Sequence, residues 1–172
     1  MKVLYYLTYA VLWLFSLLPM WVHYLISDGI YVVVYHLVGY RKKLVRKNLT
    51  DSFPEKSETE ISQIEKAFYS WFCDYLVETI KLLTISKRNL KRRMVFKGTE
   101  VVDEIVESGQ SCAVYLGHYC NWEWITSLPL WVTPKAQCGQ IYHVLENSEF
   151  DRLFLNLRSL DRKSGSAGMP RP

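Results

Sequence analysis

The chain has 172 residues, 49% of them hydrophobic and 22% charged, with a formal charge of +4 at pH 7. This hydrophobic content excludes a disordered polypeptide, and the length suits one domain with a buried core. The four cysteines lie far apart with no C-x-x-C pair, and the four histidines lack the spacing of metal ligands. We therefore expect no disulfide framework, no metal site and a reduced, cytosol-facing domain. The sequence contains no glycine-rich phosphate loop, so no cofactor is predicted.

The N-terminal segment is predicted to lie in a membrane. From Val3 to Val22 the chain carries no charged residue, which matches the roughly 20 apolar residues of a spanning helix. A signal peptide is the alternative, but the apolar stretch exceeds the roughly 7–15 residues of a signal core and no cleavage site follows it. A second apolar run, Ile30–Val38, is too short to span and is expected either at the membrane interface or buried against the domain. Residues 1–38 are interpreted as a membrane anchor with an interfacial segment.

Two clusters of basic residues follow the apolar N-terminus. They consist of Arg41, Lys42, Lys43, Arg46 and Lys47, and of Lys87, Arg88, Lys91, Arg92 and Arg93. By the positive-inside rule, the first cluster places its end of the membrane segment in the cytoplasm, and it also attracts anionic headgroups or a phosphorylated substrate. The second cluster is expected to be a solvated loop or a contact for a headgroup or carrier protein. Beside an apolar anchor, a lipid headgroup is a simpler partner than nucleic acid, so no nucleic-acid partner is predicted.

Helical patterns dominate the middle of the chain. Ser57-x-x-Glu60 is a capping-box signature, and apolar residues recur at three- and four-residue steps over residues 61–83. This pattern predicts a long amphipathic helix that packs in the core or rests on lipid. A shorter helix is predicted to begin after Thr99 and to end at Gly109, where a glycine commonly stops a helix.

Two segments of strand length come next. Ser111–Leu116 is a continuous apolar run, as a strand buried on both faces of a parallel sheet would be, and Gln137–Val144 is predicted to be a second strand. Asn121 can cap a helix between them, which makes a β-α-β unit. A further helix over Glu146–Arg158 is expected to pack back on this unit. The unpatterned residues 160–172 are expected to form a disordered tail.

The predicted fold class is therefore α/β, with an N-terminal membrane helix, a helical segment and a partial β-α-β core within a domain of residues 39–159. A sheet of two parallel strands is incomplete, because one edge and one face stay uncovered. In open parallel sheets, ligands bind beyond the carboxyl ends of the strands. This geometry directs attention to the residues that follow Leu116.

His118 follows the first predicted strand, and Glu123 follows five positions later. A regular helix would point these side chains in different directions, so they can meet only if a turn intervenes. A carboxylate that accepts a hydrogen bond from one imidazole nitrogen fixes the tautomer, and the other nitrogen can then take a proton from an alcohol. By spacing alone, which is common by chance, a capping Glu and a hydrogen-bonded loop His are the favoured interpretation.

The heptapeptide 117–123, Gly-His-Tyr-Cys-Asn-Trp-Glu, resembles the H-x-x-N-W-E signature of the bacterial lipid A biosynthesis acyltransferases. These are the late lauroyl and myristoyl transferases of the lysophospholipid-acyltransferase-like superfamily. The resemblance runs over about residues 1–159, and further similar positions are Arg46-Lys47-Asn48-Leu49, Ser52-Phe53-Pro54, Glu78, Tyr142, Asn147, Asp151 and Arg158. The sequence departs from the family pattern at His143, where an arginine usually follows the tyrosine.

The resemblance implies an acyl-carrier-protein thioester as donor and a lipid A precursor as acceptor. It also implies a single-pass protein of the bacterial inner membrane whose catalytic domain, residues 39–159, faces the cytoplasm. The family's sequences continue well beyond this length, so the chain looks C-terminally truncated.

The resemblance also assigns roles to individual residues. His118 would be the general base, Glu123 its orienting partner, and Arg158 a third, substrate-contacting catalytic residue. The substrate-binding residues would be Asn121, Tyr142 and Asn147.

Three alternatives remain open at this point. The acceptor would be a lysophospholipid or another glycolipid, or Cys120 would act as a nucleophile beside His118. The third alternative is an inactive, truncated, membrane-bound remnant of such an enzyme. Replacing Cys120 by Ser or Ala separates the nucleophilic mechanism from the general-base mechanism.

Overall fold

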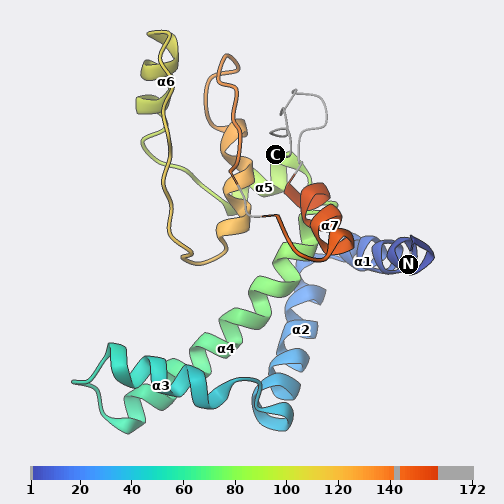
Figure 1. Cartoon of the computed structure of the whole chain (residues 1–172), viewed down its shortest axis with the longest axis vertical. Helices are drawn as coiled ribbons and strands as arrows, with labels where there is room; N and C mark the ends of the chain where they lie inside the picture. Colours follow the sequence, from blue (N-terminus) through green and yellow to red (C-terminus); the bar gives the residue numbers. More distant parts are fainter. Residues whose placement is uncertain (1, 142–143, 159–172) are drawn as a thin grey trace. The chain divides into compact units, whose positions relative to one another are not determined.

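The computed structural model describes residues 2–141 and 144–158, which form two compact units. Unit 1 contains the described residues up to Leu17 and from Thr79 onward, and unit 2 is Leu18–Glu78. The elements in chain order are α1 (Lys2–Leu17), α2 (Met20–Tyr31), η1 (Val32–Val38), α3 (Lys42–Ser52), α4 (Glu58–Lys81), α5 (Lys87–Arg93), α6 (Glu100–Glu107), η2 (Trp122–Leu130) and α7 (Ser148–Arg158) (Figure 1).

The predicted α/β fold is wrong, because the described residues form helices and no strand. Ser111–Leu116 has no regular secondary structure and is exposed throughout, with Tyr115 at 95% exposure. The described part of the second predicted strand, residues 137–141, is also irregular. A parallel strand needs hydrogen bonds from a neighbour distant in sequence, and an apolar run does not reveal whether that neighbour exists. The expected β-α-β core is therefore replaced by helices joined by extended segments, and the expected tail at 160–172 lies outside the described residues.

The apolar N-terminus is divided between two helices, so the single helix expected over Val3–Val22 is interrupted. Proline lacks an N–H donor and disfavours helical backbone in the residue before it. The helix α1 accordingly ends at Leu17, and Pro19, in an extended conformation, is the N-cap of α2. From there α2 continues into the π-helix η1, which ends at Gly39 with a positive φ of 64°. Among the described helices, Met20–Val38 is the one that is long and apolar enough to cross a membrane, judged by length and composition.

Unit 2 is organised around one side of α4. The predicted capping box is confirmed: the Ser57 backbone N–H donates to the Glu60 carboxylate over 2.9 Å, and the Glu60 N–H donates to Ser57 Oγ over 3.3 Å. Within unit 2, α4 buries Ile61, Glu65, Tyr69, Cys73 and Val77, which recur at four-residue steps. Four of these residues are ordinary core residues, whereas Glu65 carries a carboxylate.

Glu65 is 1% exposed and holds together three elements of unit 2. The Tyr35 hydroxyl on η1 donates to Glu65 Oε1 over 3.0 Å, and Arg46 Nε on α3 donates to Glu65 Oε2 over 2.5 Å. The Arg46 guanidinium holds the pKa of the Glu65 carboxyl below its usual value, and the Tyr35 hydrogen bond acts in the same direction against the effect of burial. The carboxylate therefore stays charged and joins η1 and α3 to α4.

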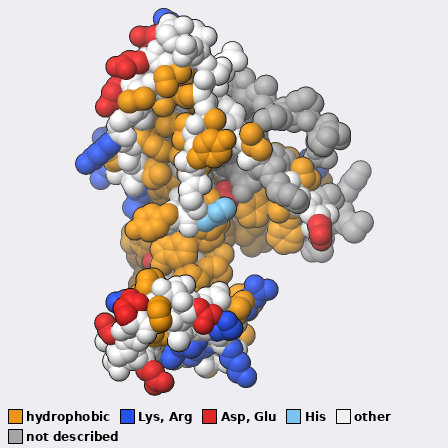
Figure 2. All heavy atoms as spheres, turned by 60° about the vertical axis from the view of Figure 1, so that its left-hand side comes forward, with side chains coloured by type: hydrophobic (Ala, Val, Ile, Leu, Met, Phe, Trp, Pro, Cys, Tyr) orange, Lys and Arg blue, Asp and Glu red, His pale blue; other side chains and the backbone are white. Residues whose placement is uncertain are grey.

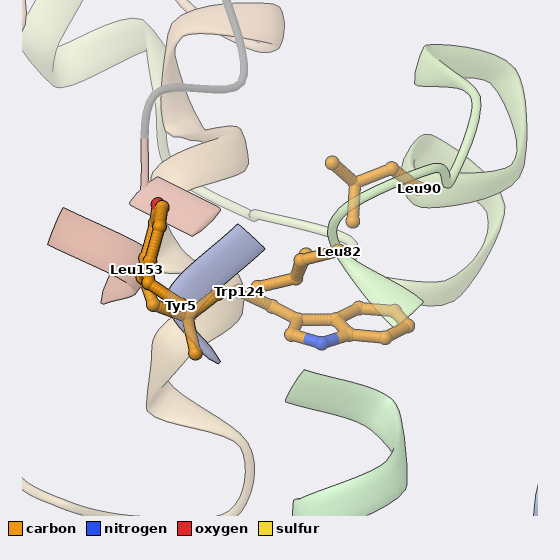
Figure 3. Packing of buried hydrophobic residues seen from close by; sticks show 5 residues of the cluster. All are labelled: Tyr5, Leu82, Leu90, Trp124 and Leu153. Atoms are coloured by element: carbon orange, nitrogen blue, oxygen red, sulfur yellow. The ribbon is translucent and has the colours of Figure 1, made fainter. Parts of the chain in front are cut away.

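Unit 1 has a small core that collects side chains from five segments. It consists of Tyr5, Leu82, Leu90, Trp124 and Leu153, and Figure 3 shows the Trp124 ring beside the two leucines at 82 and 90. These residues come from α1, the segment after α4, α5, η2 and α7. The core therefore places η2, which begins inside the heptapeptide, against α5.

Polar contacts fix the C-terminal end of α1 within the same unit. Lys81 Nζ and Thr84 Oγ1 each donate to the Ser16 carbonyl over 2.6 Å. A cation near the last carbonyls of a helix is favourable, because these groups carry the negative end of the helix dipole. Burial lowers the pKa of Lys81, and the nearby Arg93 adds to this shift.

The short helix α6 ends as the sequence predicts. Gly109, with a φ of 79°, follows the C-cap Ser108. The Gly109 N–H donates to Val106 and the Gln110 N–H donates to Ile105, which is the Schellman arrangement of hydrogen bonds. A positive φ favours glycine, so this helix end was readable from the sequence.

We predict that Glu65→Ala lowers the free energy of unfolding by about 1–3 kcal/mol, because it leaves the Tyr35 hydroxyl and the Arg46 guanidinium without their acceptor. The Arg46 side chain is 43% exposed and regains water, which limits the loss. Urea denaturation followed by circular dichroism measures the change. Glu58→Ala, which removes an exposed carboxylate from the same helix, is the matched control and should cost under about 0.5 kcal/mol. Equal losses in the two variants would contradict the role given to Glu65.

The contribution of Glu65 should also depend on pH. Its folded-state pKa is lowered, so the folded state binds a proton less readily than the unfolded state and acid favours unfolding. The stability difference between the parent chain and Glu65→Gln should be full above about pH 4.3, the ordinary value for Glu, and should shrink as pH falls toward the folded pKa. Denaturation curves collected between pH 3 and pH 7 test this. A difference that grows on acidification would exclude the assignment.

Candidate functional site

The heptapeptide 117–123 forms a tight loop that leads directly into η2. The Tyr119 N–H donates to the Gly117 carbonyl over 2.9 Å, and the Trp122 N–H donates to the Cys120 carbonyl over 3.1 Å. Each bond closes a three-residue turn, and Asn121, at φ −85° and ψ 78°, has the conformation of an inverse γ-turn. Two three-residue turns therefore follow one another over residues 117–122.

Cys120 lies between the two turns in the left-handed region, with a φ of 49°. This conformation is unfavourable for a residue with a Cβ, and such residues concentrate at functional sites. The Cys120 side chain is exposed, as are the neighbouring side chains of His118 and Tyr119. The loop therefore presents its side chains to the surface on a constrained backbone.

The turn expected between His118 and Glu123 is present. His118 lies in the loop, and Glu123 is the second residue of η2. The two side chains differ in environment, because His118 is exposed whereas Glu123 is 5% exposed. The His118 and Trp122 rings pack edge to face, with 4.8 Å between their centroids and an interplanar angle of 76°. An edge-to-face contact of this kind restricts how the imidazole can turn.

The helix η2 is anchored by side chains that it buries in the core of unit 1. Trp124 is 5% exposed and belongs to the core of unit 1, and Ser127 is fully buried with its hydroxyl donating to the Trp124 carbonyl over 2.7 Å. Because Glu123 precedes Trp124 directly, the packing of this tryptophan also sets the position of the carboxylate. Asn121 occupies the predicted N-cap position, although its side chain makes no capping hydrogen bond.

A positively charged surface adjoins η2. The basic helix α5 contacts η2 within unit 1 and inserts Leu90 into the shared core. Its exposed face carries Lys87, Arg88, Lys91, Arg92 and Arg93. Lys91 Nζ lies 4.8 Å from the centre of the Trp131 ring, which follows η2 directly. The second basic cluster is therefore a helix against the motif segment, whereas the sequence was interpreted as a loop.

Asn147 has a structural role that the sequence did not indicate. Its Oδ1 accepts hydrogen bonds from the backbone N–H groups of Glu149 and Phe150, over 3.0 and 3.1 Å, and thereby caps α7. Asp151 on the first turn of α7 is 1% exposed and accepts from the Leu145 N–H over 3.1 Å. These two residues fix the approach to α7.

The other predicted site residues are placed only in part. Arg158 is the last residue of α7, and nothing is described of its side chain. Tyr142 and its neighbour His143 lie outside the described residues. The described heptapeptide carries His118, Asn121 and Glu123 within six residues of the chain, and the side chain that packs on the His118 ring is Trp122, a contact that sequence reasoning missed. Across the described ranges, no three His, Cys, Asp or Glu side chains are grouped so that they could hold a metal ion.

We predict that Asn147→Ala lowers the free energy of unfolding by about 1 kcal/mol, because two N–H groups at the start of α7 lose their acceptor. Asn147→Ser, which can still cap the helix, should remain within a few tenths of a kcal/mol of the parent chain. Thermal and urea denaturation of both variants measure the effect. A large loss in the serine variant would indicate that the amide has a role other than capping.

Comparison with known proteins gave one match. The family model described as Bacterial lipid A biosynthesis acyltransferase matches residues 1–165, a range that includes the whole loop and η2. Neither a curated protein nor a solved structure matched the chain.

Proposed function

Since the chain belongs to the bacterial lipid A biosynthesis acyltransferase family, we propose that it transfers a fatty acyl chain from an acyl-carrier-protein thioester to a hydroxyl of a lipid A precursor. The observation that carries this proposal is the family match, which runs through the heptapeptide. Family membership supports an acyltransferase of lipid A biosynthesis, with an acyl donor and a lipid acceptor. The acyl-carrier-protein donor, the acceptor hydroxyl and the roles of His118 and Glu123 are proposed in addition to this family activity.

His118 is the proposed general base. One imidazole nitrogen takes the proton of the acceptor hydroxyl while the oxygen forms a bond to the thioester carbonyl carbon. The resulting tetrahedral intermediate breaks its carbon–sulfur bond, and the imidazolium returns the proton to the departing thiolate. The exposure of His118 on a tight loop supports this role, because both substrates have to reach the imidazole. General-base assistance of this kind typically contributes about 10²- to 10⁴-fold in rate.

Glu123 is proposed as a positioning residue. Its carboxylate would accept a hydrogen bond from the second imidazole nitrogen and would stabilise the imidazolium that forms during the reaction. Its burial on the first turn of η2, next to the core residue Trp124, supports a fixed position. The Trp122 ring would restrict the imidazole from another side. Arg158 and Tyr142 keep their proposed contacts with substrate.

The basic face of α5 supports a negatively charged substrate or carrier. Five cationic side chains lie on a helix that contacts η2, so the charge is close to the segment that carries His118 and Glu123. Opposite charges on two surfaces raise the rate of encounter and align the partners. An acidic carrier protein and a phosphorylated lipid acceptor both satisfy this requirement, and the reaction proposed here uses one of each.

The central test is acyl transfer from a radiolabelled acyl-carrier-protein thioester to a lipid A precursor in detergent micelles. His118→Ala should lower kcat by about 10²- to 10⁴-fold, because the hydroxyl loses its proton acceptor. Glu123→Gln should lower kcat less and should shift the pH profile, because the imidazolium loses its charged partner. Circular dichroism of each variant checks that the helices are retained.

Cys120→Ser is the matched control for these variants. Cys120 is exposed beside His118 in a left-handed conformation, which is the one observation that favours a nucleophilic cysteine. Under the general-base proposal the serine variant should keep its rate within a few-fold. Abolished transfer, or a trapped acyl-cysteine thioester, would replace this mechanism with a covalent one. Transfer to a lysophospholipid but not to the lipid A precursor would overturn the acceptor assignment.

A further inference from the structure

The segment Met20–Val38, formed by α2 and η1, has one apolar face without a protein partner in unit 2. In the most hydrophobic stretch of this segment, 17% of the residues are buried, whereas a core helix has most of its residues buried. Trp21, Leu25, Val33 and Leu37 recur at multiples of four residues, and three of them are more than 60% exposed. We call these four residues the outer face.

The opposite face is joined to α4 by hydrogen bonds to carboxylates. Ser27 Oγ donates to Asp74 over 2.6 Å, the Tyr24 hydroxyl donates to Glu78 over 2.8 Å, and the Tyr35 hydroxyl donates to Glu65. These contacts are spread along the length of both helices. Any position of α2 and η1 relative to a membrane therefore also determines the position of α4 between Glu65 and Glu78.

This attachment argues against a crossing orientation. Besides the three carboxylates that bind α2 and η1, α4 carries the exposed polar side chains of Gln63, Lys66 and Ser70. A pair of helices that crossed a bilayer would take these groups into hydrocarbon, which is costly for charged side chains. An outer face that enters lipid while α4 stays in water avoids that cost.

Asp28 gives an independent indication of the same orientation. It is exposed at the middle of Met20–Val38, so a crossing helix would place its carboxylate near the bilayer centre. In a helix that lies parallel to the surface, a middle residue is no deeper than the ends. Asp28 lies seven residues after Trp21 and three after Leu25, so it borders the outer face, and in the in-plane orientation its carboxylate meets the headgroups instead of the bilayer centre.

The segment that follows is suited to anionic lipid. The left-handed Gly39 precedes α3, and both Arg41, the N-cap of this helix, and Lys43 in its first turn are exposed. Lys42 lies 3.8 Å from the centre of the Tyr35 ring and links the basic segment to η1. Figure 2 shows Lys and Arg side chains at the lower end of the molecule, which carries α3 in Figure 1, with Asp and Glu side chains beside them. Cations next to an apolar helix face are typical of helices that bind the surface of anionic membranes.

We propose that α2 and η1 lie in the plane of an anionic membrane surface, with the outer face inserted at the boundary between headgroups and acyl chains and with α4 on the aqueous side. Both ends of Met20–Val38 are then on the same side of the membrane. This inference concerns unit 2 alone and does not depend on the reaction proposed above.

Flotation of the full chain with phospholipid vesicles tests the surface itself. Binding to vesicles with about one-third anionic lipid should exceed binding to zwitterionic vesicles, and Lys43→Gln should weaken the anionic binding by about five-fold. Val33→Lys should weaken binding to both by at least about ten-fold. Val101→Lys, at an exposed valine of α6, is the matched control and should bind as the parent chain does. Equal effects of the two valine variants, or equal binding to the two lipid mixtures, would overturn the proposal.

Thiol labelling distinguishes an in-plane helix from a crossing one. Cys112, Cys120 and Cys138 are replaced by serine, whereas Cys73 is retained because it is fully buried and burial raises the pKa of its thiol. Leu17→Cys, Asp28→Cys and Tyr40→Cys are then treated separately with a membrane-impermeant maleimide, in spheroplasts and in inverted membrane vesicles. All three should be labelled from the same side. Labelling of positions 17 and 40 from opposite sides, with position 28 protected, would show a crossing helix and overturn the proposal. Detergent-based acyl transfer is unaffected by either outcome, so failure here leaves the proposed reaction standing.

Discussion

The meeting of η1, α3 and α4 in unit 2 depends on a single buried charge. Removing a carboxylate from water is unfavourable unless hydrogen bonds and an opposite charge replace the lost solvation. Glu65 obtains both, from Tyr35 on η1 and from Arg46 on α3. Since these partners lie on different elements, satisfying the charge also fixes where η1 and α3 meet α4. An apolar residue at this position would fill the space without selecting that arrangement.

The sequence predicted those features of the fold that depend on residues close together in the chain. The capping box at Ser57 and Glu60 and the glycine end of α6 are local hydrogen-bond patterns, and both are confirmed. The strands failed because their hydrogen-bond partners would have to come from elsewhere in the chain. The division at Pro19 was overlooked because hydropathy counts apolar side chains and ignores the missing N–H, and the burial of Glu65 depends on partners up to 30 residues away.

For the candidate site, local reasoning correctly placed a turn after His118 and Glu123 on the first helical turn, but the buried strand expected before His118 is an exposed, irregular segment. What it missed is the support around that loop: the Trp122 ring against the imidazole, and the basic helix α5 that packs on η2 through Leu90. These contacts arise from packing within unit 1. The family match agrees with the resemblance read from the motif.

Asn147 is a residue of the family sequence pattern that has a structural role in this chain. Its side-chain oxygen is already bound by two backbone donors at the start of α7. Any residue with a short side chain and an acceptor oxygen can perform that task, so relatives are free to exchange Asn for Asp, Ser or Thr at this position. A residue that recognises one hydroxyl of a lipid has no such freedom. The variation tolerated at each motif position across the family therefore separates helix-capping positions from those that face the substrate.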